Sequence, residues 1–339
     1  MNRLLADRNH SPFSTGLRLT LANKRLLLWV YLATLAVGLG AALPFHARMA
    51  SVLDHSMAAQ GIAGRFDVSS YALLMMNLGK HGTSLYMQSF AAILGYCIVS
   101  NILAAGIYYV FATGDLPRLA VVVRSGIEYF WRFFRLLLFV LIMAGPVLAI
   151  LWALRRVLLK HTDNIYVGRQ FFFISLATFI VFALVALFFR LWFDLAEASV
   201  VQLGLDGVRC VRRVLFPSMR LLRKQFVPAY FGYFLIGCIG WAAFFLCLWL
   251  WMVAIPPRAI FPAWILGQLA TLSLLAARIW ERGLATAVVT FAEPTEVVHT
   301  AIFTPPAWQA EPAETPSTLP ASNPSAMASS ESEETGSLE

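Results

Sequence analysis

Six long stretches without Asp, Glu, Lys, Arg or His constrain what this chain can fold into. They cover 26–45, 82–114, 136–154, 170–189, 225–257 and 259–277, and each is at least 19 residues long. About 20 apolar residues in helical form cross the hydrocarbon core of a bilayer. A buried helix of a soluble protein would explain one such stretch but hardly six. Membrane spans are therefore expected at about 26–45, 87–111, 136–154, 171–189, 227–255 and 259–278.

The composition supports helices in a membrane rather than a soluble domain or a barrel. The chain is 59% hydrophobic and 13% charged, whereas soluble domains are about 45–50% apolar and about 25% charged. Strands of a membrane barrel would be about half as long and would alternate apolar and polar positions. The expected fold class is an all-α integral membrane protein with six transmembrane helices.

Three cation-rich segments lead into the first, third and fifth spans. They cover 15–30, 116–138 and 208–226, and they mix Arg and Lys with Leu, Phe and Trp. This pattern is typical of an amphipathic helix in the headgroup layer, with its cations toward anionic lipid. Membrane lipids are therefore the expected partners. The basic patches flank membrane spans, so contact with lipid headgroups and the topology of the chain account for them better than binding of nucleic acid does.

The distribution of cations predicts that both termini lie in the cytoplasm. With six spans and a cytoplasmic N-terminus, 18 of the 26 Lys and Arg residues fall on the inner side, as the positive-inside rule requires. The exception is the outer 155–169 loop, which carries Arg155, Arg156, Lys160 and Arg169. Residues 26–45 are expected to stay in the protein as a signal anchor, because no clear cleavage site follows them.

The last part of the chain differs from the rest. Residues 293–339 hold eight acids and no Lys or Arg, and they are rich in Pro, Ser, Thr and Glu. Such a segment cannot bury enough apolar surface to offset its ordering entropy. Two regions are therefore expected: a transmembrane domain at 1–292 and a disordered acidic tail at 293–339.

One group of charges sits where the fourth apolar stretch ends. Arg190, Asp194 and Glu197 are spaced i, i+4 and i+7, so they share one helical face. Arg132 and Arg135 lie at the same expected level, where the third span begins. The sequence predicts a structural charge clasp in which Asp194 and Glu197 face these two arginines. A gate latch and a catalytic dyad are the alternatives, in that order.

The uncharged stretches of the expected spans contain no Asp, Glu, Lys, Arg or His, which counts against ion-coupled transport. Asn101 and Gln268 are their strongest hydrogen-bonding groups and are expected to make contacts between helices. Glycines are expected at close helix contacts. These glycines are Gly38 and Gly40 in the first span, Gly95 in the second, and Gly232, Gly237 and Gly240 in the fifth.

Catalytic and metal-binding patterns are missing from the sequence. It contains no HExxH, GxSxG or Walker A motif. The four cysteines form no CxxC pair, so neither a zinc site nor a disulfide framework is expected. His55 and Asp67, on the expected outer side, are the centre of a metal-enzyme hypothesis, but scattered solvated residues explain them better. No cofactor and no metal are expected.

Several phrases occur together in a characteristic order. They are LANKRLLLWVYLATLAVGLGAALPF, LDHS (53–56), RFD (65–67), TGD (113–115), EYFWRFFRL (128–136) and WFDLAEASVV (192–201). Over roughly 20–285 the chain resembles a loosely defined group of uncharacterised polytopic bacterial inner-membrane proteins. The resemblance implies six spans and an inner-membrane location, and it carries no activity.

Three functions remain open from the sequence. The first is a non-enzymatic accessory or scaffold membrane protein, supported by uncharged spans and the missing catalytic motifs. The second is a permease or transporter-like subunit, suggested by Gly145-Pro146 inside the third span. The third is an outer-facing metal-dependent enzyme. A membrane-protein partner or a homo-oligomer is compatible with the first two.

Overall fold

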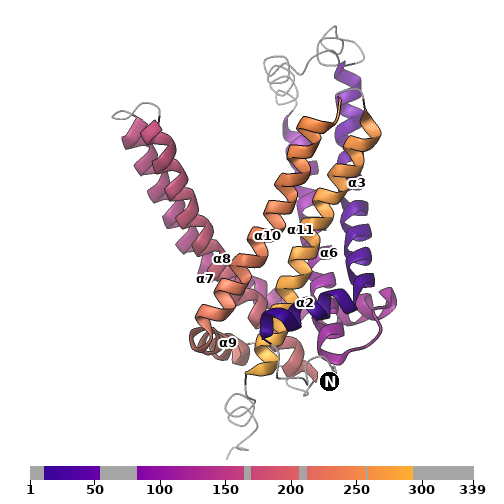
Figure 1. The fold of residues 1–339 in the computed structure, drawn as a ribbon, viewed down its shortest axis with the longest axis vertical. Coiled ribbons are helices and arrows are strands. Elements are labelled where there is room, and N and C mark those ends of the chain that lie inside the picture. The colour runs from indigo at the N-terminus through magenta and orange to yellow at the C-terminus, as the bar shows by residue number, and fades with distance from the viewer. Residues whose placement is uncertain (1–10, 54–81, 164–168, 206–211, 257–258, 293–339) are drawn as a thin grey trace, which may run out of the picture. The chain divides into compact units, whose positions relative to one another are not determined.

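The computed structural model describes residues 11–53, 82–163, 169–205, 212–256 and 259–292. Over this part of the chain the secondary structure is helical, without strands. The helices are α2 (Pro12–Ala22), α3 (Lys24–Leu53), α6 (Gly82–Thr113), α7 (Leu119–Asp163), α8 (Arg169–Leu205), α9 (Arg212–Lys224), α10 (Phe226–Ala254) and α11 (Ile260–Phe291). Their arrangement is drawn in Figure 1.

Six of these helices are long and apolar enough to cross a membrane: α3, α6, α7, α8, α10 and α11. Each contains one of the six expected spans, apart from Ile255 at the end of the fifth span and Ala259 at the start of the sixth, which fall just outside their helices. The predicted fold class is therefore confirmed, and the chain is a multi-pass membrane protein by the length and composition of its helices.

The three lead-in segments adopt two different structures. The first and third form separate helices, α2 and α9. α2 begins after Ser11, whose side-chain oxygen accepts a hydrogen bond from the Ser14 amide at 3.3 Å. The second lead-in is not a separate element, because 119–138 is the first part of α7. Its helix runs into the third span without a break.

Three spans belong to helices much longer than a bilayer requires. α7 has 45 residues, α8 has 37 and α11 has 32, which gives lengths of about 68, 56 and 48 Å at about 1.5 Å per residue. The hydrocarbon core is about 30 Å thick. All three helices therefore extend well past the length that their apolar stretches need, and the additional turns carry the charged residues.

Buried side chains gather in these additional turns. Leu191, Leu195 and Val201 are buried on α8, and Ile279 and Val288 are buried on α11. The main cluster joins α2, α3, α6, α7 and α11. Its members are Leu19, Leu26, Val30, Leu103, Ile107, Val110, Phe111, Val122, Ile279 and Ala287. The packed core thus lies at the charged end of the helices.

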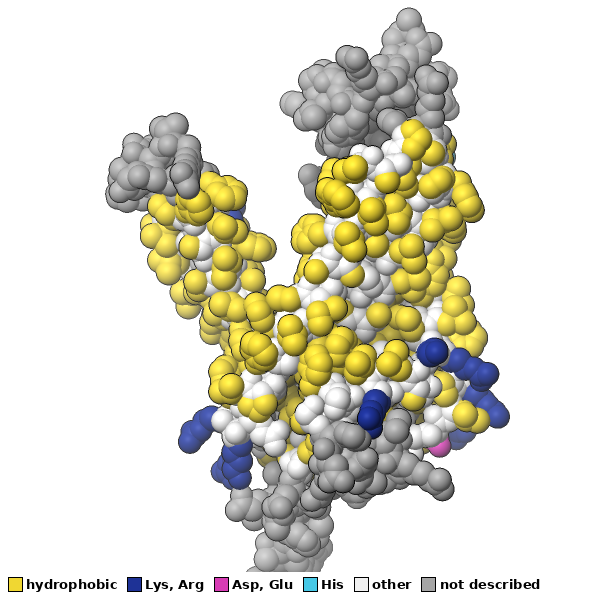
Figure 2. Space-filling model, viewed as in Figure 1, with side chains coloured by type: hydrophobic (Ala, Val, Ile, Leu, Met, Phe, Trp, Pro, Cys, Tyr) yellow, Lys and Arg dark blue, Asp and Glu magenta, His cyan; other side chains and the backbone are white. Residues whose placement is uncertain are grey.

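The apolar stretches themselves are largely exposed. Ile142 and Ile150 on α7, Phe172 on α8 and Met252 on α10 each expose more than half of their surface. Figure 2 shows this broad hydrophobic surface, with Lys and Arg side chains mostly gathered below it. An exposed surface of this composition suits lipid hydrocarbon, in which apolar side chains need no protein partner.

Glycines allow α6 and α7 to approach each other closely. A Cβ added at Gly106 would collide with the backbone oxygen of Val122, and one added at Gly126 would collide with that of Ile102. The two contacts are reciprocal, since each helix supplies one glycine. α2 and α11 approach in the same way, through Gly16 and Gly283.

Only some of the glycines that were expected at close helix contacts lie at one. Gly240 lies against Ala277, where an added Cβ would be 2.6 Å from the alanine Cβ. For Gly38, Gly40 and Gly95 the expectation is wrong, because a Cβ there would meet nothing within 4 Å among the described residues. Gly38 and Gly40 are exposed and Gly95 is partly exposed, and none of the described helices approaches them closely.

The chain divides into two units, Met1–Pro294 and Thr295–Glu339. The first holds all the helices given above. The second lies outside the described residues, and with it nearly all of the tail expected to be disordered. Residues 54–81, which include His55 and Asp67, also lie outside them.

Candidate functional site

Six charged side chains meet where α8 and α11 pack together, and they are called the charge network below. They are Arg190, Asp194 and Glu197 of α8 and Arg278, Glu281 and Arg282 of α11. Asp194, Glu197, Glu281 and Arg282 are 0, 2, 2 and 6% exposed. The network joins three cations with three acids, so its formal charges balance.

Arg278 is the centre of the network. Its Nη1 and Nη2 atoms donate to Asp194 Oδ2 and Oδ1 at 2.5 and 2.8 Å, which is a bidentate pair. Nη1 also donates to Glu281 Oε2 at 3.0 Å and lies 3.5 Å from the Tyr233 hydroxyl. Arg190 Nη2 donates to the same Glu281 oxygen at 2.5 Å. Two acids and two arginines are thus held by one another.

Burial makes the members of this network depend on each other. Removing charges from water costs several kcal/mol per ion, and the loss is offset only when partners and hydrogen bonds are well placed. Asp194 is fully buried, and the side chain of Arg278 is 23% exposed. A change at Arg278 would therefore leave a buried acid without its counter-charge.

One edge of the network has polar atoms without well-formed hydrogen bonds. Glu197 Oε2, Tyr108 Oη of α6 and Arg282 Nε are buried without a well-formed hydrogen bond in the described part of the chain, and the Tyr108 hydroxyl lies close to the Glu197 carboxylate. The charges of Asp194, Glu197, Arg278 and Arg282 all act on the Tyr108 hydroxyl. Buried polar groups of this kind are usually satisfied by ordered water.

The predicted pairing of Asp194 with Arg132 and Arg135 is wrong, whereas Arg190, Asp194 and Glu197 of the predicted clasp do lie in the charge network. Asp194 is paired with Arg278 and not with Arg132 or Arg135. The guanidinium of Arg132 lies 5.0 Å from the centre of the Tyr129 ring, and that of Arg135 lies 5.2 Å from the Trp131 ring. The prediction paired helices that are consecutive in sequence, whereas the buried charges of α8 face α11.

Sequence reasoning missed Arg278, Glu281 and Arg282 as a group. A signal was present, because these residues are spaced i, i+3 and i+4 in RIWER and so share a helical face. Their charges complement those of Arg190, Asp194 and Glu197. Tyr108 and Tyr233 carried no such signal, since an aromatic residue in an apolar stretch is ordinary.

Two further polar contacts join α11 to other helices. Tyr31 of α3 donates its hydroxyl hydrogen to Gln268 Oε1 of α11 at 2.8 Å, so Gln268 lies at a contact of the kind expected for it. Gln202 of α8 donates to Thr290 of α11 at 2.7 Å. For Asn101, a partly buried residue of α6, the expected contact stays a prediction.

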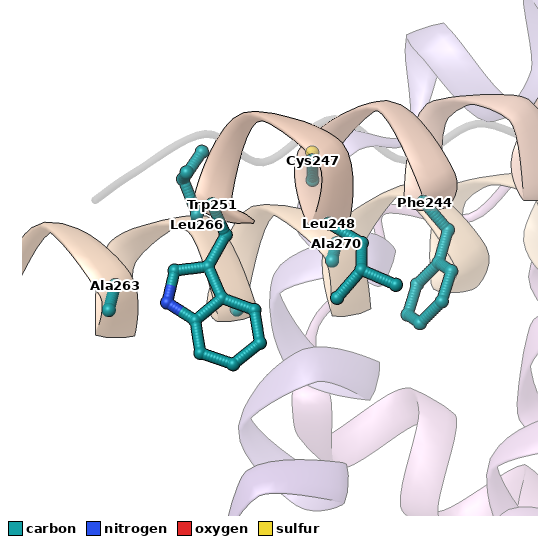
Figure 3. Close-up of a pocket in the computed structure, with 8 residues that line it drawn as sticks. Phe244, Cys247, Leu248, Trp251, Ala263, Leu266 and Ala270 are labelled. Carbon is teal, nitrogen blue, oxygen red and sulfur yellow. The ribbon is translucent and has the colours of Figure 1, made fainter. Parts of the chain in front are cut away.

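A separate groove lies between α10 and α11, away from the charges. Its volume is about 270 Å³, and its lining is almost wholly apolar. The lining residues are Phe244, Cys247, Leu248, Trp251, Ala263, Leu266, Gly267 and Ala270. Figure 3 shows the rings of Phe244 and Trp251 set apart along the groove. It carries no group that could act as an acid, base or metal ligand apart from the thiol of Cys247.

Metal chemistry finds no support in the part of the chain that the structure describes. No group of three or more His, Cys, Asp or Glu residues there could hold a metal ion. His55 and Asp67, on which the metal-enzyme hypothesis rests, lie outside the described residues. That hypothesis stays a prediction.

Comparison with protein-family models, with curated proteins and with solved structures finds no match for this chain. The functional argument therefore rests on its own residues.

Proposed function

We propose that this protein is a non-enzymatic accessory or scaffold protein of the bacterial inner membrane, with both termini in the cytoplasm. The observation that carries the proposal is the mutual pairing of Arg190, Asp194, Arg278 and Glu281. Ion pairs closed on one another hold helices in one arrangement. Their hydrogen-bonding groups are already engaged within the protein, which favours a structural role.

The exposed apolar stretches support the scaffold role. α7 and α8 pair with each other, and their apolar halves leave large side chains such as Ile142, Ile150 and Phe172 uncovered. In a bilayer such a helix pair offers its surface to lipid, to a membrane-protein partner or to a second copy. A core fixed at one end would keep this surface in a constant orientation.

The test is co-purification of the tagged full chain from native membranes in mild detergent. We expect a stoichiometric membrane-protein partner or a homo-oligomer. The Arg278→Met variant should lose this assembly together with folded protein, whereas Arg135→Met, at an exposed site, should keep it. A wild-type protein that is recovered alone as a monomer would contradict the proposal.

A proton-coupled permease is the second candidate, and one observation favours it. The sequence argument against coupled transport was that the spans contain no ionisable residue. Glu197 is nevertheless buried on α8, about two turns beyond the apolar stretch of the fourth span, and one of its carboxylate oxygens has no well-formed hydrogen bond among the described residues. Ionisable groups in such positions commonly serve proton relays.

Proteoliposomes loaded with a pH-sensitive dye test this candidate. Under an imposed membrane potential, a permease of this kind should acidify the interior, and Glu197→Gln should abolish the signal. Glu128→Gln, at an exposed acid of α7, is the matched control and should retain it. A wild-type signal equal to that of protein-free vesicles would remove the candidate.

A further inference from the structure

The apolar side of α9 faces the protein. α9 has the sequence RRVLFPSMRLLRK, with five cations and no acid. Val214, Ser218 and Leu222 are spaced i, i+4 and i+8, and each is no more than 2% exposed. The helix contacts α8 and, to a smaller extent, α10. This side is therefore not available to a bilayer, unlike the apolar side of an ordinary surface-bound amphipathic helix.

The outward side of α9 combines cations with an exposed aromatic ring. Arg220, Arg223 and Lys224 are exposed, and the exposed fractions of Phe216 and Met219 are 84 and 41%. Phe216, Arg220 and Arg223 are spaced i, i+4 and i+7, so the ring lies in line with two guanidinium groups. These five residues are called the α9 basic face below.

The position of α9 in the chain places this face at a membrane boundary. The helix ends at Lys224, and α10, a candidate span, begins at Phe226. One residue separates the last cation from the first residue of the span. Lys and Arg at the end of a span lie at the level of the lipid phosphates.

We propose that the α9 basic face binds the headgroups of anionic phospholipids. Arg220 and Arg223 would donate to phosphate oxygens, which guanidinium groups match in geometry, and Phe216 would enter the upper part of the acyl layer. An aromatic ring among cations suits a surface that is charged outside and apolar below. A soluble polyanion would give such a ring no apolar layer to enter. The inference does not depend on the proposed scaffold function.

The experiment uses the full chain in neutral detergent micelles, titrated with phosphatidylglycerol or with phosphatidylcholine of the same acyl chains. Bound lipids are counted by native mass spectrometry. Wild type should prefer phosphatidylglycerol. Each cation near an anionic surface contributes about 1 kcal/mol, so Arg220→Gln/Arg223→Gln should weaken that binding roughly 30-fold. Both side chains are exposed, so this variant should fold normally, which size-exclusion chromatography verifies.

Two further variants separate this site from general charge. Arg156→Gln/Lys160→Gln removes the same net charge at exposed positions near the other end of α7 and should weaken the binding of phosphatidylglycerol much less than Arg220→Gln/Arg223→Gln does. Phe216→Ser should weaken binding while preserving its dependence on salt, because it removes no charge.

Three outcomes would overturn the proposal. An equal loss of binding in both double variants would mean that net charge, and not this face, attracts the lipid. Displacement of the lipid by millimolar inorganic phosphate would indicate a simple anion site. An acidic protein whose co-purification is lost in Arg220→Gln/Arg223→Gln, with lipid binding intact, would replace lipid by a protein partner.

Discussion

Arg278 is the single residue on which the charge network depends most. It bonds both oxygens of Asp194 and one of Glu281, so three of its contacts are with buried acids. Other charged residues at this end of the helices, such as Arg135, lie at the surface. The effect of a substitution should therefore follow burial and pairing rather than charge alone.

Arg278→Met should lower the free energy of unfolding by about 3–5 kcal/mol, because it leaves Asp194 buried without a counter-charge. The measurement is thermal unfolding in detergent, followed by loss of the folded peak in size-exclusion chromatography. Arg135→Met removes an exposed arginine stacked on Trp131 and should cost about 1 kcal/mol or less. Similar losses in the two variants would show that Arg278 is no more than a surface charge.

A double-mutant cycle tests which arginine is the partner of Asp194. Asp194→Asn and Arg278→Met should be coupled by about 1–3 kcal/mol, since each removes the partner of the other. Asp194→Asn and Arg132→Met should be additive, because Arg132 packs on Tyr129 instead. The reverse pattern would restore the pairing predicted from the sequence and contradict the observed one.

The residues of the site were only half predictable, for a physical reason. Helical spacing placed Arg190, Asp194 and Glu197 on one face, and that local inference holds because the segment is a helix. The opposing face belongs to α11, more than eighty residues later in the chain. Periodicity within one helix does not specify which distant helix covers it.

At the scale of elements, the backbones of α6 and α7 approach each other closely where the two helices cross. Gly106 and Gly126 leave room only for hydrogen at their α carbons. Glycine costs about 1 kcal/mol in a helix relative to alanine, so its presence at both positions is explained by the close approach of the two backbones.

Gly126→Ala should therefore destabilise the protein by about 1–3 kcal/mol, despite the better helix propensity of alanine. Gly95→Ala, in α6 but with no neighbour within 4 Å of the added carbon, is the matched control and should be neutral or stabilising. Detergent unfolding midpoints of the two variants provide the comparison. A neutral Gly126→Ala would contradict the close approach.

The helices could be predicted from the sequence only where charged residues mark the ends of an apolar stretch. An uncharged stretch of about 20 residues identifies a span, and all six lie in helices. The additional turns of α7, α8 and α11 were not predictable as continuous helix, because they contain charges that also suit a surface segment. Only packing against other helices, as around Leu195 and Ile279, shows that they are core.

At the scale of the whole molecule, the packed core and the cation-rich helices lie at the same end of the spans. α2 contacts α11 at Gly16 and Gly283, and α9 follows the end of α8 and contacts it. Both helices carry cations of the segments assigned to the inner side. From the positive-inside rule we predict that the core end of the molecule faces the cytoplasm.

Reporter fusions test whether the core end of the molecule and the C-terminus face the cytoplasm. A fluorescent protein fused after Glu339 should be fluorescent in cells, because it would fold in the cytoplasm. Alkaline phosphatase inserted after Asn164, between α7 and α8, should be active, because it would be exported. The second fusion is the more demanding one, since four of the outer cations flank that loop. Short loops with many cations tend to stay on the cytoplasmic side. The stability of the two long helices would therefore have to hold this loop outside. An inactive phosphatase there, with a fluorescent C-terminal fusion, would mean that α7 and α8 do not both cross the membrane.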